Sequence, residues 1–405
     1  MLPELVVSGM GVIASIGQGK EAFADALFAG DTAYGVMQRP GRQRDSAYLG
    51  AEIGEIRFPA SVARQTVRAA SLSGQAALVV LEEAWTEARL AEVDPRRIGL
   101  IVGGSNVQQR ELLQIQETYR DSAAFLRPTY ALSFMDSDLC GFCTAQFGIR
   151  GMAYTVGGAS ASGQLAIVQA AQAVITKQVD VCIALGSLMD ISHWECRGLR
   201  SIGAMGSDRY AGEPELACRP FDRDHDGFIF GESCGAVVIE SAESAGRRGV
   251  QPYASLRGWG IAMDANRNPD PSLDGETEAI RTALEGAGWS PAQVDYVNTH
   301  GTGSTSGDET ELKALNACGI DGAFLNATKS LIGHGLSAAG TVEVVATMLQ
   351  MRAGRLHPTH NLENPIAPEL NWVRSEPVEH SIDRALTSSF GFGGINTALC
   401  WERAS

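Results

Sequence analysis

The sequence has no long apolar run. None of its 405 residues lies in a stretch of the roughly 18 consecutive apolar residues that a membrane-spanning helix needs. The beginning of the chain also lacks a basic segment followed by an apolar one, the pattern of a secretion signal. We therefore expect a soluble protein of the reducing cytoplasm.

Basic residues are scarce relative to acidic ones. The chain has 32 Lys and Arg against 47 Asp and Glu, a formal net charge of −15. An acidic surface repels nucleic-acid phosphates and anionic lipids, which excludes both as main partners. An acidic protein partner would need a local basic patch.

Motifs for metals and nucleotides are incomplete. Gly9-Met-Gly11 lacks the third glycine of a dinucleotide loop, and the calcium-like start at Asp222 has Ser233 where the loop needs a glutamate. Cys140 and Cys143 form a lone C-x-x-C, which we interpret as two small buried residues on a helix. No metal site and no disulfide framework is predicted.

Short β-type runs alternate with longer helical patterns over the whole chain. With 44% hydrophobic and 20% charged residues and 46 glycines, this pattern predicts an α/β protein with a large core and mostly parallel strands. Predicted strands are 5–8, 98–102, 153–156, 181–185, 236–241, 253–259, 294–298, 324–327, 386–390 and 397–402. Predicted helices are 20–29, 71–87, 162–177, 275–286, 308–317 and 337–352.

The two halves of the chain have a similar order of elements. Each has a strand ending in a glycine-rich loop (102–104 and 300–303), then a strand that leads to a reactive-looking residue and a helix. The most hydrophilic seam, 240–251, predicts a boundary between halves 1–245 and 246–405. Segments 39–45 and 266–275 are predicted surface loops.

Ser160 occupies a turn of small residues between a predicted strand and a predicted helix. A side chain there sits at a helix N-terminus, where free backbone N–H groups favour developing negative charge. The segment Gly158-Ala-Ser-Ala-Ser162 misses the G-x-S-x-G nucleophile elbow by one residue.

Two histidines and a lysine lie where open α/β sheets build sites. His300 follows the strand 294–298, and Lys329 follows the strand 324–327. His334 lies between two glycines before a helix. The carboxyl ends of parallel strands meet at one edge of a sheet, so we expect Ser160, His300, Lys329 and His334 to form one catalytic site.

Four segments together resemble the β-ketoacyl-acyl carrier protein synthase (ketosynthase) family. They are Val156-Gly-Gly-Ala-Ser-Ala-Ser-Gly163, Val297-Asn-Thr-His-Gly-Thr-Gly303, Asn326-Ala-Thr-Lys-Ser-Leu-Ile-Gly-His334 and Phe390-Gly-Phe-Gly-Gly394. The resemblance extends from Val7 to Gly394. It implies a duplicated thiolase fold of five layers, α-β-α-β-α, with the site between the halves.

The resemblance also implies roles for the site residues. Ser160 stands at the position of the family's nucleophilic cysteine. His300 and His334 match the pair that donates hydrogen bonds to the carbonyl of a malonyl thioester.

Three further residues match supporting positions of the family. Lys329 matches the lysine of the polar network, and Glu232 matches an acidic residue near it. Phe392 matches a gating residue whose backbone N–H joins that of Ser160 in an oxyanion hole. The chain departs from the family at Ser388, where an asparagine is usual, and within Gly231-Glu-Ser-Cys-Gly235.

The serine changes which reaction we expect. A hydroxyl needs an adjacent base to become a nucleophile. Decarboxylation needs a dry pocket that holds the carboxylate out of the carbonyl plane, and donors to the thioester oxygen. The sequence thus resembles the Cys-to-Ser decarboxylases of polyketide β-branching cassettes, which act beside a hydroxymethylglutaryl (HMG)-synthase-like enzyme. Their reaction converts malonyl-acyl carrier protein to acetyl-acyl carrier protein and carbon dioxide.

The same resemblance implies the partners. The substrate is presented on the phosphopantetheine arm of an acyl carrier protein, and no cofactor or metal of the enzyme's own is expected. We expect a homodimer through the strand 152–156. Arg64, Arg68 and Arg127 are candidates for a basic carrier-docking patch near the entrance of the site.

Three alternatives remain. Ser160 could serve a hydrolase or acyltransferase, which would require a carboxylate behind one histidine. The chain could be a catalytically silent subunit like a chain-length factor, although intact His300, Lys329 and His334 argue against that. Ordinary condensation through Ser160 is the third.

Overall fold

Two sets of strands with the same order form the centre of the molecule. The computed structural model describes residues 3–404. The N-terminal half contributes β1 (Leu5–Ala14), β5 (Ile98–Gly103), β6 (Ala153–Val156), β7 (Val181–Gly186) and β9 (Ser233–Ser241), in the order β1-β9-β7-β5-β6. The C-terminal half contributes β10 (Ala254–Met263), β11 (Tyr296–Asn298), β12 (Phe324–Asn326), β14 (Asn371–Trp372), β16 (Arg384–Gly391) and β17 (Ile395–Arg403).

The second set repeats the first. Its order is β10-β17-β16-β11-β12, with β14 added at the edge. In each half the outer strands are parallel, three in the N-terminal half and four in the C-terminal half, and the two strands nearest the middle are antiparallel to their neighbours. The halves join where β1 pairs with β10, with Val6 opposite Ser255. β6 and β12 are therefore equivalent strands, and each precedes a part of the site.

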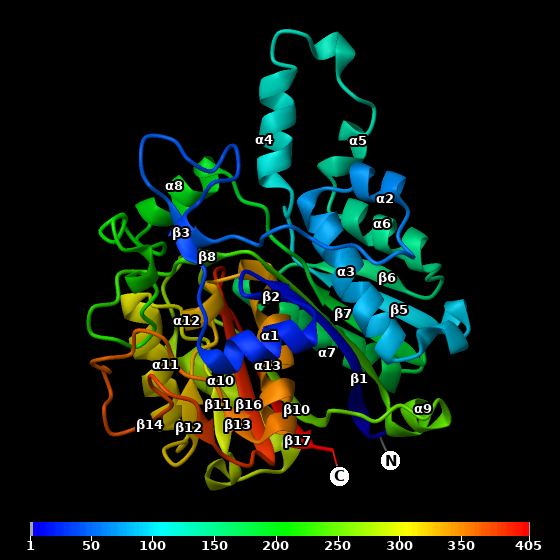
Figure 1. Cartoon of the computed structure of the whole chain (residues 1–405). Coiled ribbons are helices and arrows are strands. Elements are labelled where there is room, and N and C mark those ends of the chain that lie inside the picture. The colour runs from blue at the N-terminus through cyan, green and yellow to red at the C-terminus, as the bar shows by residue number, and fades with distance from the viewer. Residues whose placement is uncertain (1–2, 405) are drawn as a thin grey trace.

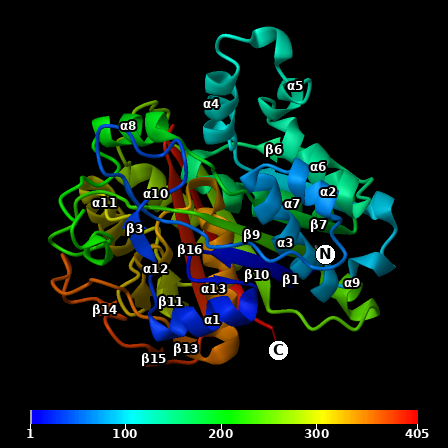
Figure 2. The same ribbon diagram turned by 45° about the horizontal axis from the view of Figure 1, so that its top comes forward.

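Helices cover both faces of each strand set (Figure 1, Figure 2). α3 (Leu72–Glu87) and α6 (Ser137–Phe147) pack on the first set, and α10 (Leu273–Ala287) and α11 (Thr305–Ala317) cover the second. α7 (Ser162–Ile175) and α13 (Ala339–Ala353) lie between the two sets. This confirms the predicted α-β-α-β-α layering. α13 is buried at every residue from 339 to 351, as a central helix requires.

Glycines allow the same close contact in both halves. A Cβ at Gly11 of β1 would come 1.9 Å from the Val80 carbonyl oxygen of α3. A Cβ at Gly260 of β10 would come 1.9 Å from the Ala279 carbonyl oxygen of α10. Larger residues at either site would force a helix off its strand.

All ten predicted strands and six predicted helices are present, and α1 (Lys20–Ala29) has the predicted bounds. Cys140 and Cys143 are buried on α6, as expected. Helices that are very short or mostly polar were not predicted: α2 (Arg64–Ala69), α4 (Gln109–Thr118), α5 (Tyr130–Ser133), α8 (His193–Ser201), α9 (Ala242–Arg247) and α12 (Lys329–Ile332). Short strands were also missed: β2 (Gly17–Gln18), β3 (Tyr34–Val36), β4 (Leu49–Ala51), β8 (Phe230–Gly231), β13 (Arg355–Leu356), β14 and β15 (Val378–Glu379).

One predicted surface loop and the predicted boundary between the halves both contain buried charges. In segment 39–45, Arg42 is fully buried and paired with Asp190 and Glu232. In the seam 240–251, the buried Glu240 pairs with Arg248. The prediction of a surface loop was wrong for Arg42, because sequence shows a charge but not its distant partner.

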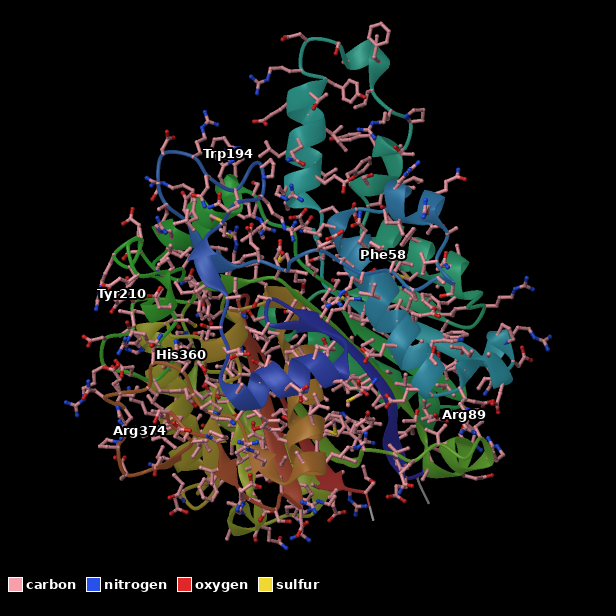
Figure 3. All side chains as sticks on the ribbon, in the orientation of Figure 1. Phe58, Arg89, Trp194, Tyr210, His360 and Arg374 are labelled. Atoms are coloured by element: carbon pink, nitrogen blue, oxygen red, sulfur yellow. The ribbon has the colours of Figure 1, made fainter. Side chains whose placement is uncertain are left out.

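An arm formed by α4, α5 and the segment between them projects from the body (Figure 1). Phe125, Leu132 and Phe134 on this arm are 79%, 57% and 55% exposed, whereas side chains fill the space between the layers (Figure 3). No helix within residues 3–404 has the length and apolar character needed to cross a membrane.

Candidate active site

Ser160 lies in a tight turn between β6 and α7. The turn, η4 (Ala159–Ala161), is a single turn of 3₁₀-helix in which Ala159 has a φ of 47°. The Ser162 hydroxyl fixes it by accepting from the Gly158 N–H at 2.9 Å and donating to the Ala159 carbonyl at 2.7 Å. A strained turn of this kind holds a side chain in one direction. Ser160 is 8% exposed.

The equivalent turn of the C-terminal half carries His334. It lies between α12 and η7 (Leu336–Ala338), where Gly333 and Leu336 have φ values of 75° and 52°. The His334 backbone N–H donates to the Ile229 carbonyl at 2.7 Å. The two turns contact each other, which brings His334 Nε2 within 2.8 Å of Ser160 Oγ.

The surroundings of His334 determine which ring nitrogen carries the proton. Burial and the charge of Lys329 hold the pKa of His334 well below its usual value, so the ring is neutral. The Leu336 N–H donates to Nδ1 at 3.3 Å, so Nδ1 is the acceptor. Nε2 therefore carries the hydrogen and donates it to Ser160 Oγ. Held in this way, His334 is a donor and not a base for Ser160.

His300 is held in the same state by a different neighbour. Lys329 Nζ lies 3.3 Å from His300 Nδ1 and also donates to the His300 carbonyl. Burial, Lys329 and His334 lower the pKa of His300 well below its usual value. An ammonium group has no acceptor, so Nδ1 accepts and Nε2 carries the hydrogen. The two imidazole rings meet edge to face, with centroids 5.6 Å apart.

The buried partner of Lys329 is Glu343 on α13. The two side chains form an ion pair and are each 1% exposed. Burial raises the pKa of Glu343 to about 7, although Lys329 counteracts this shift. The expectation that Glu232 lies near Lys329 is therefore wrong. Arg39 and Arg42 enclose Glu232 instead, because the segment 39–42 folds over it.

A second glutamate that sequence reasoning missed supports His300. Glu311 on α11 accepts from the backbone N–H groups of His300 at 2.6 Å and Gly301 at 2.8 Å. The Ser388 hydroxyl donates to the same carboxyl group at 2.8 Å, so the serine at this position keeps a polar contact within the site. Burial raises the pKa of Glu311 to about 7 despite these donors.

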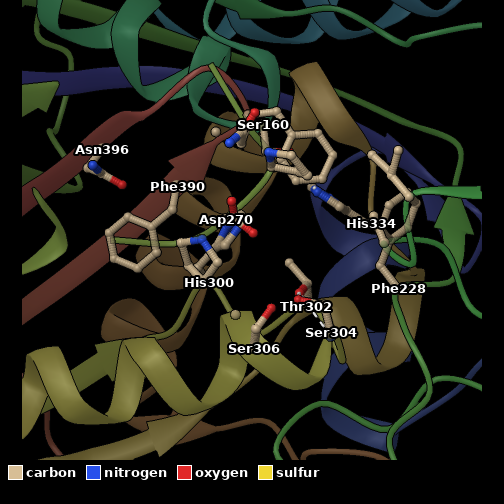
Figure 4. Close-up of a pocket in the computed structure, with 18 of the residues that line it drawn as sticks. Ser160, Phe228, Asp270, His300, Thr302, Ser304, Ser306, His334, Phe390 and Asn396 are labelled. Carbon is tan, nitrogen blue, oxygen red and sulfur yellow. Dashed lines mark hydrogen bonds between the residues drawn. The ribbon is translucent and has the colours of Figure 1, made fainter. Parts of the chain in front are cut away.

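Ser160, His300 and His334 line one cavity of about 140 Å³ (Figure 4). Phe392 also lines it and is 41% exposed. The adjoining Gly391 packs on the Ser160 turn, since a Cβ there would come 2.3 Å from the Gly158 carbonyl oxygen.

One wall of the cavity carries hydroxyl groups. Thr302, Ser304 and Ser306 lie on one side of it, as Figure 4 shows. Within residues 3–404 no group of three or more His, Cys, Asp or Glu side chains is arranged to hold a metal ion.

The predicted docking arginines lie away from the cavity, on exposed elements. Arg64 and Arg68 are exposed on α2. Arg127 is exposed on the arm and lines a surface groove with Leu72 and Arg110, just beyond the end of α2. The fold thus brings α2, with Arg64 and Arg68, close to the arm that carries Arg127.

Comparisons with known proteins show the family of the chain. Residues 3–245 match the family model of the beta-ketoacyl synthase N-terminal domain, and residues 253–363 match that of the C-terminal domain. "Polyketide biosynthesis malonyl-ACP decarboxylase PksF" of Bacillus subtilis (strain 168) is 59% identical over 399 residues, covering 98% of this chain and 96% of the relative.

Solved structures show the same fold over the full length. A β-ketoacyl synthase from Burkholderia phymatum STM815 matches with a TM-score of 0.89 at 26% identity, and 100% of both chains is covered. A type II polyketide ketosynthase in complex with its acyl-carrier protein matches with a TM-score of 0.88 at 25% identity, again over 100% of both chains. The chain belongs to the β-ketoacyl synthase family.

Proposed function

We propose that this chain removes carbon dioxide from a malonyl group carried by an acyl carrier protein and leaves an acetyl group on the carrier. One observation carries the proposal: His300 and His334 are both held as neutral N–H donors beside Ser160. Such an arrangement binds a developing oxyanion but supplies no base. It therefore suits decarboxylation better than acyl transfer.

The reaction follows from these donors. The malonyl thioester enters the cavity with its carbonyl oxygen toward the two Nε2–H groups. The bond between the α-carbon and the carboxylate breaks and carbon dioxide leaves. The electron pair of the broken bond stays with the thioester fragment, which becomes an enolate. Negative charge then grows on the thioester oxygen, where each preorganised donor stabilises it by about 3–4 kcal/mol. The enolate carbon takes a proton and becomes the acetyl group.

Ser160 is a poor nucleophile in this setting. It accepts a hydrogen bond from His334, and within residues 3–404 neither histidine has a carboxylate on its far nitrogen, as a serine-hydrolase triad would require. The oxygen keeps its own proton, which it can offer in a hydrogen bond within the cavity but does not transfer, because an aliphatic hydroxyl is a very weak acid. Without an acyl group on residue 160, the enolate has nothing to attack, so condensation does not follow. The name of the PksF relative describes this same decarboxylation.

Intact-protein mass spectrometry tests the proposal. Malonyl-loaded acyl carrier protein is incubated with the wild type and with His300→Ala. We expect acetyl-loaded carrier from the wild type, almost none from His300→Ala, and no mass gain on the enzyme. Malonyl-carrier that survives the wild-type enzyme, for a carrier from the same gene cluster, would contradict the proposal.

We also propose that Arg64, Arg68 and Arg127 receive the carrier. All three are exposed on a molecule with a net charge of −15, and the groove that includes Arg127 begins where α2 ends. Charge reversal at Arg68 should raise KM for malonyl-carrier and weaken its salt dependence, with little change in kcat. The exposed Arg267 is a matched control. An unchanged KM would contradict the proposal and show that the carrier docks on another surface.

The chain is proposed to form a homodimer through β6. This strand ends the sheet, so one of its edges is unpaired in the described chain. The arm with its exposed apolar side chains returns to the body next to this strand, where the Thr155 hydroxyl donates to the Asp136 carbonyl at 2.8 Å. An exposed strand edge is a template for pairing with a second strand. Sedimentation should give a dimer, and Thr155→Pro should dissociate it. A monomeric wild type at micromolar concentration would contradict this.

The setting of the reaction is part of the proposal. All eight cysteines are free and buried, which suits a reducing compartment such as the cytoplasm. Acetyl-carrier is the class of donor that an HMG-synthase-like enzyme consumes, so we propose such an enzyme as the next catalyst. The silent-subunit alternative predicts no carbon dioxide release in the same assay.

A further inference from the structure

The reaction needs a proton, and the residues already described do not supply it. The enolate carbon must gain a hydrogen after carbon dioxide leaves. His300 and His334 are neutral, and a neutral imidazole gives up its N–H only very reluctantly. The Lys329 ammonium is directed at Glu343 and at the His300 carbonyl.

Glu276 is a buried carboxyl group that lines the same cavity and has no role in the reaction steps described above. It lies in the first turn of α10, is 1% exposed, and lines the cavity together with Ser160, His300 and His334. Its Oε2 atom has no hydrogen-bond partner in the described part of the chain. A buried polar atom without a partner is costly and calls for an explanation.

The neighbours of Glu276 are acidic. Glu311 on α11 and Asp264 after β10 both act on it electrostatically. Its chain neighbour Gly275 rests on Asp264 and Asn396, since a Cβ there would come 1.8 Å from Asp264 Oδ1. Burial, with the two acidic neighbours, raises the pKa of Glu276 to about 10. The group is thus an uncharged carboxylic acid at neutral pH.

We propose that Glu276 is the acid that protonates the enolate carbon, directly or through one water in the cavity. The O–H bond of Glu276 breaks, its electron pair stays on the carboxylate, and a C–H bond forms at the α-carbon. Solvent at the cavity mouth then returns the proton to Glu276. This step rests on the proposed decarboxylation and adds the source of its proton.

Other acids of the cavity suit this task less well. Asp270 is exposed to solvent at the cavity wall. Burial raises the pKa of Asp264. Its carboxylate is only half-buried, however, and it accepts a hydrogen bond from Asn396 at 2.7 Å that counteracts this shift. Glu276 combines burial, an unpartnered oxygen and a place in the cavity wall.

The test separates protonation from carbon dioxide release. Wild type, Glu276→Gln and the exposed control Glu278→Gln react with malonyl-carrier in buffer containing ¹³C-bicarbonate and carbonic anhydrase. Glutamine keeps the shape and the neutral state but is no acid. We expect acetyl-carrier formation to fall about 100-fold in Glu276→Gln only, the low end for loss of a general acid. We also expect ¹³C to enter its remaining malonyl-carrier, because the unprotonated enolate recaptures carbon dioxide.

The other outcomes are distinct. Wild-type rates in Glu276→Gln would overturn the inference, and so would a slower reaction without ¹³C exchange, which indicates a structural role. If the wild type itself forms no acetyl-carrier, the proposed function fails first.

Discussion

The turns after β6 and β12 occupy equivalent places in the two halves, yet they present opposite chemistry. Each has a residue with positive φ, Ala159 in one and Leu336 in the other, and each leads into a helix of the central layer. The first presents a hydroxyl that accepts a hydrogen bond. The second presents an imidazole fixed as a donor by its own backbone. A duplicated fold thus builds an asymmetric site.

The difference extends beyond the turns. Behind Ser160 the central helix α7 consists of small and apolar residues and three glutamines, and it carries no charge. Behind the histidines lie Lys329, Glu343 and Glu311, all buried. The C-terminal half therefore carries the charges that prepare the site for an enolate. The N-terminal half contributes only the position from which a nucleophile would act.

Removing a donor should produce the largest effect on activity. His300→Ala or His334→Ala each takes away one preorganised N–H, so kcat should fall about 10²- to 10³-fold. Single-turnover decarboxylation of malonyl-carrier measures this loss. A loss below fivefold in both variants would show that the donors do not stabilise the enolate.

Breaking the buried ion pair should mainly affect stability. Lys329→Met leaves Glu343 as an unpaired buried acid, and we expect the free energy of unfolding to drop by about 3–5 kcal/mol. Urea unfolding followed by circular dichroism measures the change. The double variant with Glu343→Gln should recover much of the loss. Equal loss in single and double variants would contradict the pairing.

The raised pKa of Glu276 predicts a pH-dependent difference in stability. The folded protein keeps this proton up to about pH 10, whereas an unfolded glutamate loses it near 4.5. The wild type should therefore lose stability relative to Glu276→Gln as pH rises from 5 to 8, by about 1 kcal/mol per pH unit. Urea unfolding of both proteins at four pH values measures the gap. A constant gap would mean that Glu276 is ionised.

Restoring sulfur at the first turn should have the smallest effect on decarboxylation. In Ser160→Cys the donors are unchanged, so the rate should stay within about tenfold. The new thiol should form an acyl adduct with acyl-loaded carrier, visible as a mass gain on the enzyme. Absence of any adduct would show that the site excludes acylation for reasons beyond the serine.

The two turns could be predicted from sequence because their signals are local. Ser160 and His334 both follow strand-like runs, have small residues or glycines beside them and precede helices. His300 could be placed in the same way. Strand and helix positions in the core were also predictable, since they depend on short-range apolar patterns.

The supporting acids could not be predicted, because their surroundings are created by packing. Glu311, Glu343 and Glu276 lie on helices, where an isolated glutamate looks like any solvated residue. Glu232 was assigned to Lys329 wrongly, since nothing local reveals that Arg39 and Arg42 cross 193 and 190 residues to reach it. Which carboxyl group meets which cation depends on the tertiary fold.

The most direct test of the account compares Ser160→Ala with His334→Ala on malonyl-loaded carrier, with the masses of carrier and enzyme followed over time. Because the two side chains are hydrogen-bonded to each other, comparing the two variants shows which of the two turns performs the chemistry. We predict that Ser160→Ala still forms acetyl-carrier at no less than about a tenth of the wild-type rate, while His334→Ala nearly stops. An inactive Ser160→Ala, together with an acyl adduct on the wild-type enzyme, would contradict the account and make Ser160 the nucleophile.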